Sequence, residues 1–312
     1  IGSISHLRVM DVPMPEPGAG QVRVVVHCAA VNPADPKMLE GQFIARFLHS
    51  TKLPMIPGYD VAGVVDAVGA GVSDLAVGDR VFGHQQYASA TVHGTFAEAT
   101  VIDANAVAKL PDDVAFATAA AATTAAMTAL QSLRDIGGLS SGGRVLVVGA
   151  AGGVGTLAVA IAKRLGAHVT AICNARTAEM VSKLGADVVL DRSAGDPYAS
   201  GGPYDVIFDT PGVCTLGQVS AVLAADGTLV TTMPTMAFAA AKLATLLSRR
   251  SVGFVNVKSK RADLALVGGW LADGMPVAIE ARFPVRDGAK AIAALTTGGR
   301  TGRIIVDVAG GW

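Results

Sequence analysis

The sequence predicts an α/β protein with a β-rich domain and a second domain built on a doubly wound, six-stranded parallel sheet. Short apolar runs separated by Gly and Pro fill the first part of the chain, which is typical of a β-rich domain. From about Asp113 onward, apolar strand-like segments alternate with Ala-rich helical segments, which is typical of a parallel sheet. With 312 residues and 51% hydrophobic side chains, the chain can form two hydrophobic cores.

The expected strands of the β-rich domain cover residues 21–26, 61–65, 79–82 and 96–101. The first of these alternates polar and apolar residues, and the Pro and Gly residues of the segment 13–18 mark a loop before it. An Ala-rich helix over residues 116–133 then begins the second domain.

Six strands and four helices alternate along the second domain. The expected strands are residues 144–149, 168–173, 187–190, 204–208, 228–233 and 252–257, and the expected helices are 153–165, 177–184, 216–224 and 237–248. This order describes a complete doubly wound sheet. The tail from 276 to 308 adds two strand-like pieces around a helix at 287–295. We assign the tail to the first domain, because a parallel sheet of six strands needs no extra antiparallel pair. The predicted boundaries are 1–113 with 258–312 for the first domain, and 114–257 for the second.

A glycine-rich turn joins the first strand and the first helix of the second domain. Its sequence is Gly-Ala-Ala-Gly-Gly-Val-Gly over 149–155, after four apolar β-forming residues. A helix whose first turn has almost no side chains lets a pyrophosphate approach the backbone N–H groups. We therefore expect a dinucleotide site made by Gly149, Ala150, Gly152, Gly153, Val154 and Gly155.

The residues after the second strand indicate NADPH rather than NADH. In an NAD-binding unit, an Asp or Glu about 20 residues beyond the glycine turn binds the ribose hydroxyls. Asn174 holds that place here and Arg176 follows it, and a guanidinium can pair with a 2′-phosphate in bidentate fashion. Arg192, after the third strand, is a second candidate for the phosphate contact. A solvated surface position remains the alternative for both arginines.

The composition favours small-molecule chemistry inside the cell. Acidic and basic residues balance at 25 each without runs, so there is no electrostatic signature of nucleic-acid or membrane-surface binding. No apolar stretch of ~18 residues lacks charges or helix breakers. Cys28, Cys173 and Cys214 lie far apart without metal-binding spacing, which favours core packing in a reducing compartment. We expect a cytoplasmic protein.

Eight motifs in this order resemble the quinone oxidoreductase (zeta-crystallin-like) and enone reductase branch of the medium-chain dehydrogenases/reductases. They are PEPGAGQV at 15–22, VNPADPK at 31–37, PGYDVAGVV at 57–65, VGDRVFG at 77–83, GTFAE at 94–98, MTALQSL at 127–133, the glycine turn at 149–155 and GRIIV at 302–306. The resemblance implies a GroES-like β-domain built from both chain ends around a Rossmann domain, with the active site between them. It also implies a homodimer, for which we expect contact through the edge strand 252–257.

The superfamily also contains zinc enzymes, and this chain departs from their ligand set. Where they carry a Cys ligand this chain has Asn32, in place of the His and Glu of their Gly-His-Glu motif it has Tyr59 and Asp60, and in place of a later Cys it has Thr124. Of these side chains only Asp60 is a good zinc ligand. The four-cysteine structural lobe is absent, and we expect His84 and His93 to lie in a solvated polar loop. The sequence therefore predicts no metal site.

Without a metal to polarise its oxygen, the hydride acceptor must already be electrophilic, as a quinone or an α,β-unsaturated carbonyl is. The resemblance places Asn32 and Thr128 beside the nicotinamide. Tyr59 could hydrogen-bond the substrate oxygen and Lys37 could stabilise an enolate, although packing and surface roles explain these two residues equally well.

The predicted function is NADPH-dependent reduction of a small hydrophobic quinone or of an activated C=C bond. Two alternatives stay open. One is an NAD(P)-dependent alcohol dehydrogenase, and the other is an NADPH-binding structural or redox-sensing protein without turnover.

Overall fold

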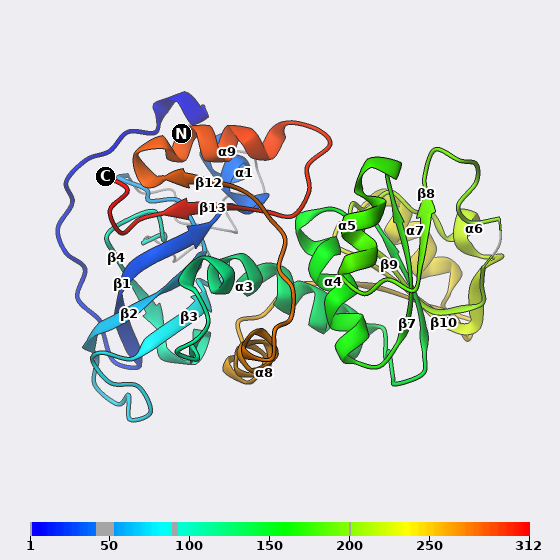
Figure 1. The fold of residues 1–312 in the computed structure, drawn as a ribbon, viewed down its shortest axis with the longest axis horizontal. Coiled ribbons are helices and arrows are strands. Elements are labelled where there is room, and N and C mark those ends of the chain that lie inside the picture. Colours follow the sequence, from blue (N-terminus) through cyan, green and yellow to red (C-terminus); the bar gives the residue numbers. More distant parts are fainter. Residues whose placement is uncertain (1, 42–52, 89–92, 200) are drawn as a thin grey trace. The chain divides into compact units, whose positions relative to one another are not determined.

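The computed structural model describes residues 2–41, 53–88, 93–199 and 201–312, and the chain divides into two compact units (Figure 1). Unit 1 contains Ile1–Thr124 and Lys258–Trp312, and unit 2 contains Ala125–Val257. The sequence placed the first boundary at 113/114, whereas the contacts divide the chain inside helix α3 (Phe116–Leu130). The residues of this helix thus belong to both units.

Unit 1 is organised around a seven-stranded sheet. Its strands are β1 (Gln21–Ala30), β2 (Asp60–Val68), β3 (Arg80–His84), β4 (Ala99–Asp103), β5 (Val107–Lys109), β12 (Ile279–Pro284) and β13 (Arg303–Asp307). Strand β1 pairs antiparallel with β2, β4 and β13. Its side chains at Val22, Val24 and Val26 are buried in alternation, which directs one face of the strand into the core.

The two strands of the tail join unit 1, as the sequence predicts. Strands β12 and β13 are parallel to each other, and β13 is antiparallel to β1. Our expectation of an antiparallel pair was wrong, because helix α9 (Gly288–Thr296) lies between β12 and β13 and supplies the crossover that a parallel pair needs. Figure 1 shows α9 beside these two strands.

Among the described residues of unit 1, the other helices are α1 (Ala34–Leu39) and α8 (Arg261–Ala272). Helix α8 packs on β3 and β5, and the sequence analysis missed it because Gly268 and Gly269 interrupt its helical pattern. Gly268 lies against Phe82, where a Cβ atom would come within 3.3 Å of the ring. Among the described residues, no helix is both long enough and apolar enough to cross a bilayer.

Unit 2 contains the predicted six-stranded parallel sheet. Its strands are β6 (Arg144–Val148), β7 (His168–Cys173), β8 (Val188–Asp191), β9 (Tyr204–Asp209), β10 (Leu223–Thr231) and β11 (Ser251–Phe254). Their order is β11-β10-β9-β6-β7-β8, and each neighbouring pair is parallel. Its helices are α4 (Gly153–Arg164), α5 (Ala178–Lys183), α6 (Leu216–Val219) and α7 (Met236–Ala244). A π-helical segment, Gln131–Ile136, continues α3.

Several elements of unit 2 are shorter than the sequence predicts, among them helix α7, which ends at Ala244 rather than at residue 248. Helix α6 has four residues instead of the expected 216–224, because β10 already begins at Leu223, which pairs with Tyr204. Strand β11 ends at Phe254 rather than at residue 257. Short 3₁₀ segments lie at Ile4–His6, Ala104–Ala106, Ala175–Thr177 and Val285–Asp287.

Candidate functional site

The glycine turn of unit 2 forms a tight connection between β6 and α4. Gly149 has φ +74°, a conformation that favours glycine, and its carbonyl accepts the Gly152 N–H at 3.0 Å. A Cβ atom on Gly155 would lie 2.1 Å from the Gly149 carbonyl oxygen. The first turn of α4 therefore packs directly on the turn, and its N-terminal N–H groups form the kind of site that binds a phosphate anion.

The carboxyl ends of neighbouring strands bring the other predicted cofactor residues to the same edge of the sheet. The Ala150 N–H donates to the Ile172 carbonyl at 3.0 Å, which joins the glycine turn to β7. The Arg192 N–H donates to the Cys173 carbonyl at 2.9 Å, which joins the segment after β8 to β7. Asn174 is half-buried directly after β7, and the side chains of Arg176 and Arg192 are exposed.

Asp191, at the end of β8, holds this region together, and the sequence analysis did not single it out. Its carboxylate accepts the Ser193 backbone N–H at 3.0 Å and the Ser193 hydroxyl at 2.8 Å. These bonds and the Ala175 N–H hold the pKa of Asp191 below its usual value. The carboxylate thus fixes the turn that carries Arg176, and a carboxylate at the end of the third strand was the available signal.

One edge of the unit 1 sheet gathers a second cluster of polar side chains. Asn32 follows the end of β1, Asp60 begins β2, His84 ends β3 and Arg303 begins β13. Because β1 is antiparallel to both β2 and β13, and β2 is antiparallel to β3, these termini meet at the same edge. Thr124 completes the cluster, which we call the Asp60 cluster.

Asp60 accepts hydrogen bonds from every other member of the cluster except the His84 ring. Its Oδ2 accepts from Arg303 at 2.7 Å and from Asn32 Nδ2 at 2.9 Å. Its Oδ1 accepts from the Thr124 backbone N–H at 3.1 Å and from the Thr124 hydroxyl. Burial alone would raise the pKa of Asp60, but His84, Arg303 and Thr124 together outweigh burial and hold this pKa below its usual value.

The residues of the Asp60 cluster do not fit a zinc ion. Of the four residues that stand in place of zinc ligands, only Asp60 is a good zinc ligand. Both of its carboxylate oxygens already accept hydrogen bonds within the cluster. The fully charged guanidinium of Arg303, only 4% exposed, stands beside them and would repel a dication. Among the described residues, no group of three or more His, Cys, Asp or Glu side chains has metal-binding geometry. We therefore derive no step through zinc.

His84 is not a solvated loop residue, and our expectation for it was wrong. Strand β3 runs to residue 84, and the cross-strand register places His84 opposite Asp60. The side chain is fully buried, and Nδ1 lies 2.6 Å from Thr124 Oγ1 and 3.6 Å from Asp60 Oδ1. The polar residues that follow 84 concealed the end of the strand in the sequence. His93 is half-buried, and its carbonyl accepts from Thr100 and Gln85.

Asp35 and two tyrosines surround the cluster. Asp35, in the first turn of α1, is fully buried and accepts the N–H groups of Asn32 at 2.7 Å and Gly58 at 2.9 Å. Burial raises the pKa of Asp35 to about 7 and raises the pKa of Tyr59 and Tyr87 above their usual values. The Tyr59 and Tyr87 rings pack edge to face, with centroids 4.6 Å apart.

The remaining predicted site residues are placed as follows. Both polar atoms of Asn32 bond within the cluster, since Oδ1 accepts from Arg303 at 3.0 Å and Nδ2 donates to Asp60. The Tyr59 hydroxyl is buried and donates to Met38 Sδ at 3.5 Å. Lys37 is half-buried on α1, and Thr128 is buried on α3 within unit 2. The roles of these four residues toward nicotinamide and substrate stay predictions.

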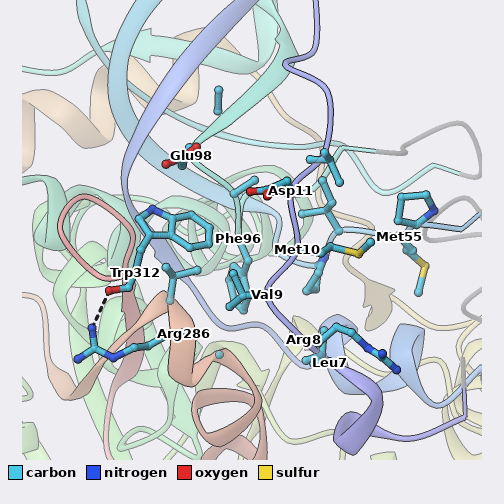
Figure 2. A pocket seen from close by; sticks show the side chains of 18 of the residues that line it. Leu7, Arg8, Val9, Met10, Asp11, Met55, Phe96, Glu98, Arg286 and Trp312 are labelled. Atoms are coloured by element: carbon cyan, nitrogen blue, oxygen red, sulfur yellow. Dashed lines mark hydrogen bonds between the residues drawn. The ribbon is translucent and has the colours of Figure 1, made fainter.

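Unit 1 also contains a cavity of about 400 Å³ (Figure 2). It lies between the extended N-terminal stretch from Leu7 to Pro15 and the segments around Met55, Phe96 and Arg286, and Trp312 borders it. The Arg286 guanidinium donates to the Trp312 carbonyl at 2.9 Å, as drawn in Figure 2. No predicted site residue lines this cavity, so we assign none of the predicted chemistry to it.

Comparison with known proteins agrees with both halves of this architecture. Residues 18–112 match the alcohol dehydrogenase GroES-like domain model, and residues 184–306 match the zinc-binding dehydrogenase model. The chain is 33% identical over 319 residues to a chloroplast envelope quinone oxidoreductase homolog of Arabidopsis thaliana, covering 98% of this chain and 95% of that protein.

Of two further relatives, one is similar along nearly its whole length and the other over only part of its length. The quinone oxidoreductase structure from Coxiella burnetii superposes with a TM-score of 0.86 at 27% identity, covering 98% of this chain and 96% of that one. An NADPH-dependent alkenal/one oxidoreductase of Arabidopsis thaliana is 35% identical over 219 residues, which span 68% of this chain and 56% of that protein. The fold is that of a medium-chain dehydrogenase/reductase. Within that superfamily, the chain belongs to the quinone oxidoreductase family.

Proposed function

We propose that this protein is an NADPH-dependent reductase that transfers a hydride to a quinone or to the activated C=C bond of an α,β-unsaturated carbonyl. The observation that carries the proposal is the Arg303–Asp60 ion pair, with its 2.7 Å contact, among the residues that stand in place of zinc ligands. A site arranged in this way supplies no Lewis acid to an alcohol or aldehyde oxygen. It therefore favours an acceptor that is electrophilic on its own.

NADPH supplies the hydride, and the residues of unit 2 fit this cofactor. The glycine turn and the N-terminus of α4 would hold the pyrophosphate, because the absence of a Cβ atom at 155 lets the first turn of α4 pack directly on the turn. Arg176 and Arg192, both exposed beside the ends of β7 and β8, would meet the 2′-phosphate. The names of two relatives, a quinone oxidoreductase homolog and an NADPH-dependent alkenal/one oxidoreductase, support the cofactor and the substrate class.

A steady-state scan tests this function. We expect oxidation of NADPH, and much slower oxidation of NADH, in the presence of 1,4-benzoquinone or of simple enones such as 2-cyclohexenone. We expect no reduction of NADP⁺ by simple alcohols, which is the reaction of the dehydrogenase alternative. Tight NADPH binding without turnover of any acceptor would instead support the structural or redox-sensing alternative.

A homodimer is part of the proposal. Strand β11 is at the edge of the unit 2 sheet, and helix α7 packs beside it, with Lys242 Nζ donating to the Val252 carbonyl at 2.9 Å. Helix α7 and the turn after it expose Met236, Leu243, Leu246 and Leu247. Pairing of two copies at this edge would satisfy the backbone groups of β11 and cover these side chains.

Light scattering of the L243E/L247E double variant tests this arrangement. Wild type should have the mass of a dimer and the variant that of a monomer, whereas L266E, a change at an exposed leucine of α8, should stay dimeric. A wild-type monomer would reject the proposal.

A cytoplasmic location is also proposed, and it rests on the three free cysteines.

A further inference from the structure

The strand order of the unit 2 sheet reverses between β6 and β9. Strands β7 and β8 follow β6 toward one edge of the sheet, whereas β9, β10 and β11 lie on the other side of β6. In a doubly wound sheet, ligands bind outside the carboxyl ends of the strands at such a reversal. The glycine turn follows β6 at this position, and residues 210–215, which we call the 210–215 loop, follow β9.

The start of the 210–215 loop contacts the glycine turn directly. The Thr210 hydroxyl donates to the Val148 carbonyl at 2.9 Å. A Cβ atom on Gly149 would lie 2.7 Å from the Thr210 hydroxyl oxygen and 2.9 Å from Pro211 Cδ. The Thr232 hydroxyl, just after β10, donates to the Thr210 carbonyl at 2.8 Å. These contacts fix the start of the loop against both the glycine turn and the end of β10.

Asp209, the last residue of β9, holds the next part of the loop. Asp209 is only 1% exposed, and its Oδ1 accepts the Gly212 N–H at 3.0 Å while its Oδ2 accepts the Cys214 N–H at 2.7 Å. Val213 lies between these two N–H groups and is 63% exposed. The carboxylate therefore fixes the backbone on both sides of Val213 and leaves Val213 on the surface, next to the glycine turn.

The thiol of Cys214 is not a reactive group of this loop. Burial, and then the negative charge of Asp209, raise the pKa of Cys214 to about 12. Its Sγ lies 3.2 Å from the Tyr198 hydroxyl oxygen. The thiol thus stays protonated at neutral pH, and the thiolate is the form that reacts. We therefore expect the loop to act through its shape and its backbone rather than through a nucleophile.

We propose that Asp209 is a positioning residue, which holds the 210–215 loop as a contact surface for the nicotinamide half of NADPH. This inference rests on the proposed function, in which NADPH is the cofactor. Arg176 and Arg192 follow β7 and β8, so the 2′-phosphate and its adenosine lie on that side of the glycine turn. With the pyrophosphate on the turn, the nicotinamide half extends to the opposite side, over the ends of β9 and β10. Asp209 acts through the loop and does not contact the cofactor itself.

Two ligands separate this role from a general role in folding. NADPH has both halves of the cofactor, whereas adenosine 2′,5′-bisphosphate has the adenosine and the 2′-phosphate but no nicotinamide. A loop that contacts the nicotinamide half responds to NADPH alone. A residue that only stabilises unit 2 affects the binding of both ligands equally.

The primary experiment measures amide hydrogen exchange of the wild-type chain, free and saturated with each ligand. The Val213 N–H has no hydrogen-bond partner among the described residues, so it should exchange rapidly in the free protein. We expect NADPH to slow this exchange and adenosine 2′,5′-bisphosphate to leave it unchanged. Equal slowing by the two ligands, or no slowing by saturating NADPH, overturns the proposal. This result depends neither on a variant that folds nor on turnover.

Two variants of β9 then test Asp209 itself. Asp209→Asn keeps one acceptor oxygen and loses the other, so the Kd for NADPH should rise by about 10-fold and that for adenosine 2′,5′-bisphosphate should not change. The matched control is Asp205→Asn at the opposite end of β9, where the carboxylate accepts the Arg144 N–H at 2.7 Å. It should change neither Kd.

The outcomes distinguish this inference from the proposed function. An unchanged Kd for NADPH in Asp209→Asn, or an equal rise for both ligands, would contradict the role of Asp209. Turnover of NADPH by a wild-type chain in which Val213 exchange is unaffected would reject the inference alone. A wild-type chain that does not bind NADPH would reject the proposed function and this inference with it.

Discussion

Arg303 and Asp60 form a buried ion pair, with Nη2 and Oδ2 2.7 Å apart, although 243 positions separate the two residues in the chain. Arg303 also donates to the Ala121 carbonyl at 3.1 Å and to Asn32 Oδ1 at 3.0 Å. The pair joins the last strand of unit 1 to β2 and to α3. It places a permanent positive charge beside the carboxylate that would otherwise be the best metal ligand at this edge of the sheet.

Removing the guanidinium should destabilise the fold. In Arg303→Met, Asp60 would stay buried without its counter-charge, so the free energy of unfolding should fall by about 3–5 kcal/mol. Urea unfolding followed by circular dichroism measures this change. As a control, Arg282→Ala breaks the more exposed pair with Asp307 and should cost no more than about 1 kcal/mol. Equal losses in the two variants would show that the buried pair has no special role.

Stability should depend on Asp60 at acid pH. Its pKa is held below the usual value in the folded state, so its contribution is complete above pH ~4 and is lost as the pH falls through the folded-state pKa. Asp60→Asn should be less stable than wild type at pH 7 and should lose less further stability between about pH 5 and 3. Urea midpoints across this range test the prediction, with Asp66→Asn, at the partly exposed Arg23 pair, as the control. Parallel acid curves for wild type and Asp60→Asn would contradict it.

Substitution by alanine should have different effects on stability at two glycines of the glycine turn. In Gly155→Ala, the new Cβ would lie 2.1 Å from the Gly149 oxygen and 2.8 Å from Ala150 Cα, both backbone atoms that cannot move aside cheaply. We expect a loss of about 1–3 kcal/mol in stability and at least ~10-fold weaker NADPH binding. In Gly152→Ala, the nearest atom is 3.3 Å away, so the fold should keep its stability. Thermal unfolding and NADPH fluorescence titration measure both effects, and similar stability losses would contradict the model of the turn.

Arg176 should distinguish NADPH from NADH. Removing a guanidinium that pairs with the 2′-phosphate should raise the Kd for NADPH by about 10–100-fold and leave that for NADH unchanged. Cofactor titration of Arg176→Ala tests this, and Arg192→Ala compares the second candidate. Lys183→Ala is the matched control, because Lys183 is an exposed cation paired with Glu179 on α5. An equal rise in the Kd for NADPH and for NADH would show that Arg176 supports the turn but does not contact the 2′-phosphate.

Local sequence patterns were sufficient for the sheet of unit 2. The central strands β6 and β9 are buried on both faces and appear as short apolar runs, and the helices between the strands follow their own period. The local pattern was not sufficient where a helix and a strand adjoin and either could include the same residues. Residues 223 and 224 have a helical pattern but join β10, because Leu223 pairs with Tyr204. Helix α8 was hidden by Gly268, which only the contact with Phe82 explains.

The unit 1 site was harder to predict than the cofactor site. The glycine turn, Asn174 and Arg176 lie within 30 residues, so a cofactor role for them could be predicted from one βαβ unit. The Asp60 cluster joins the ends of four strands that are far apart in the chain. No local sequence pattern predicts which strand ends lie next to each other in the sheet. His84 was therefore predicted to lie in a polar loop. Arg303 was noted only as a member of the family motif at 302–306, and no role was predicted for it.

The sequence by itself determined the class of fold, the glycine turn between a strand and a helix, and the absence of the usual zinc-ligand residue types. Those features depend on which residues are neighbours in the chain. Only the tertiary structure decided that Arg303 neutralises Asp60 and that Thr124 orients the His84 ring. Strand pairing brings these side chains together, and burial then makes each of them depend on the partner it meets there.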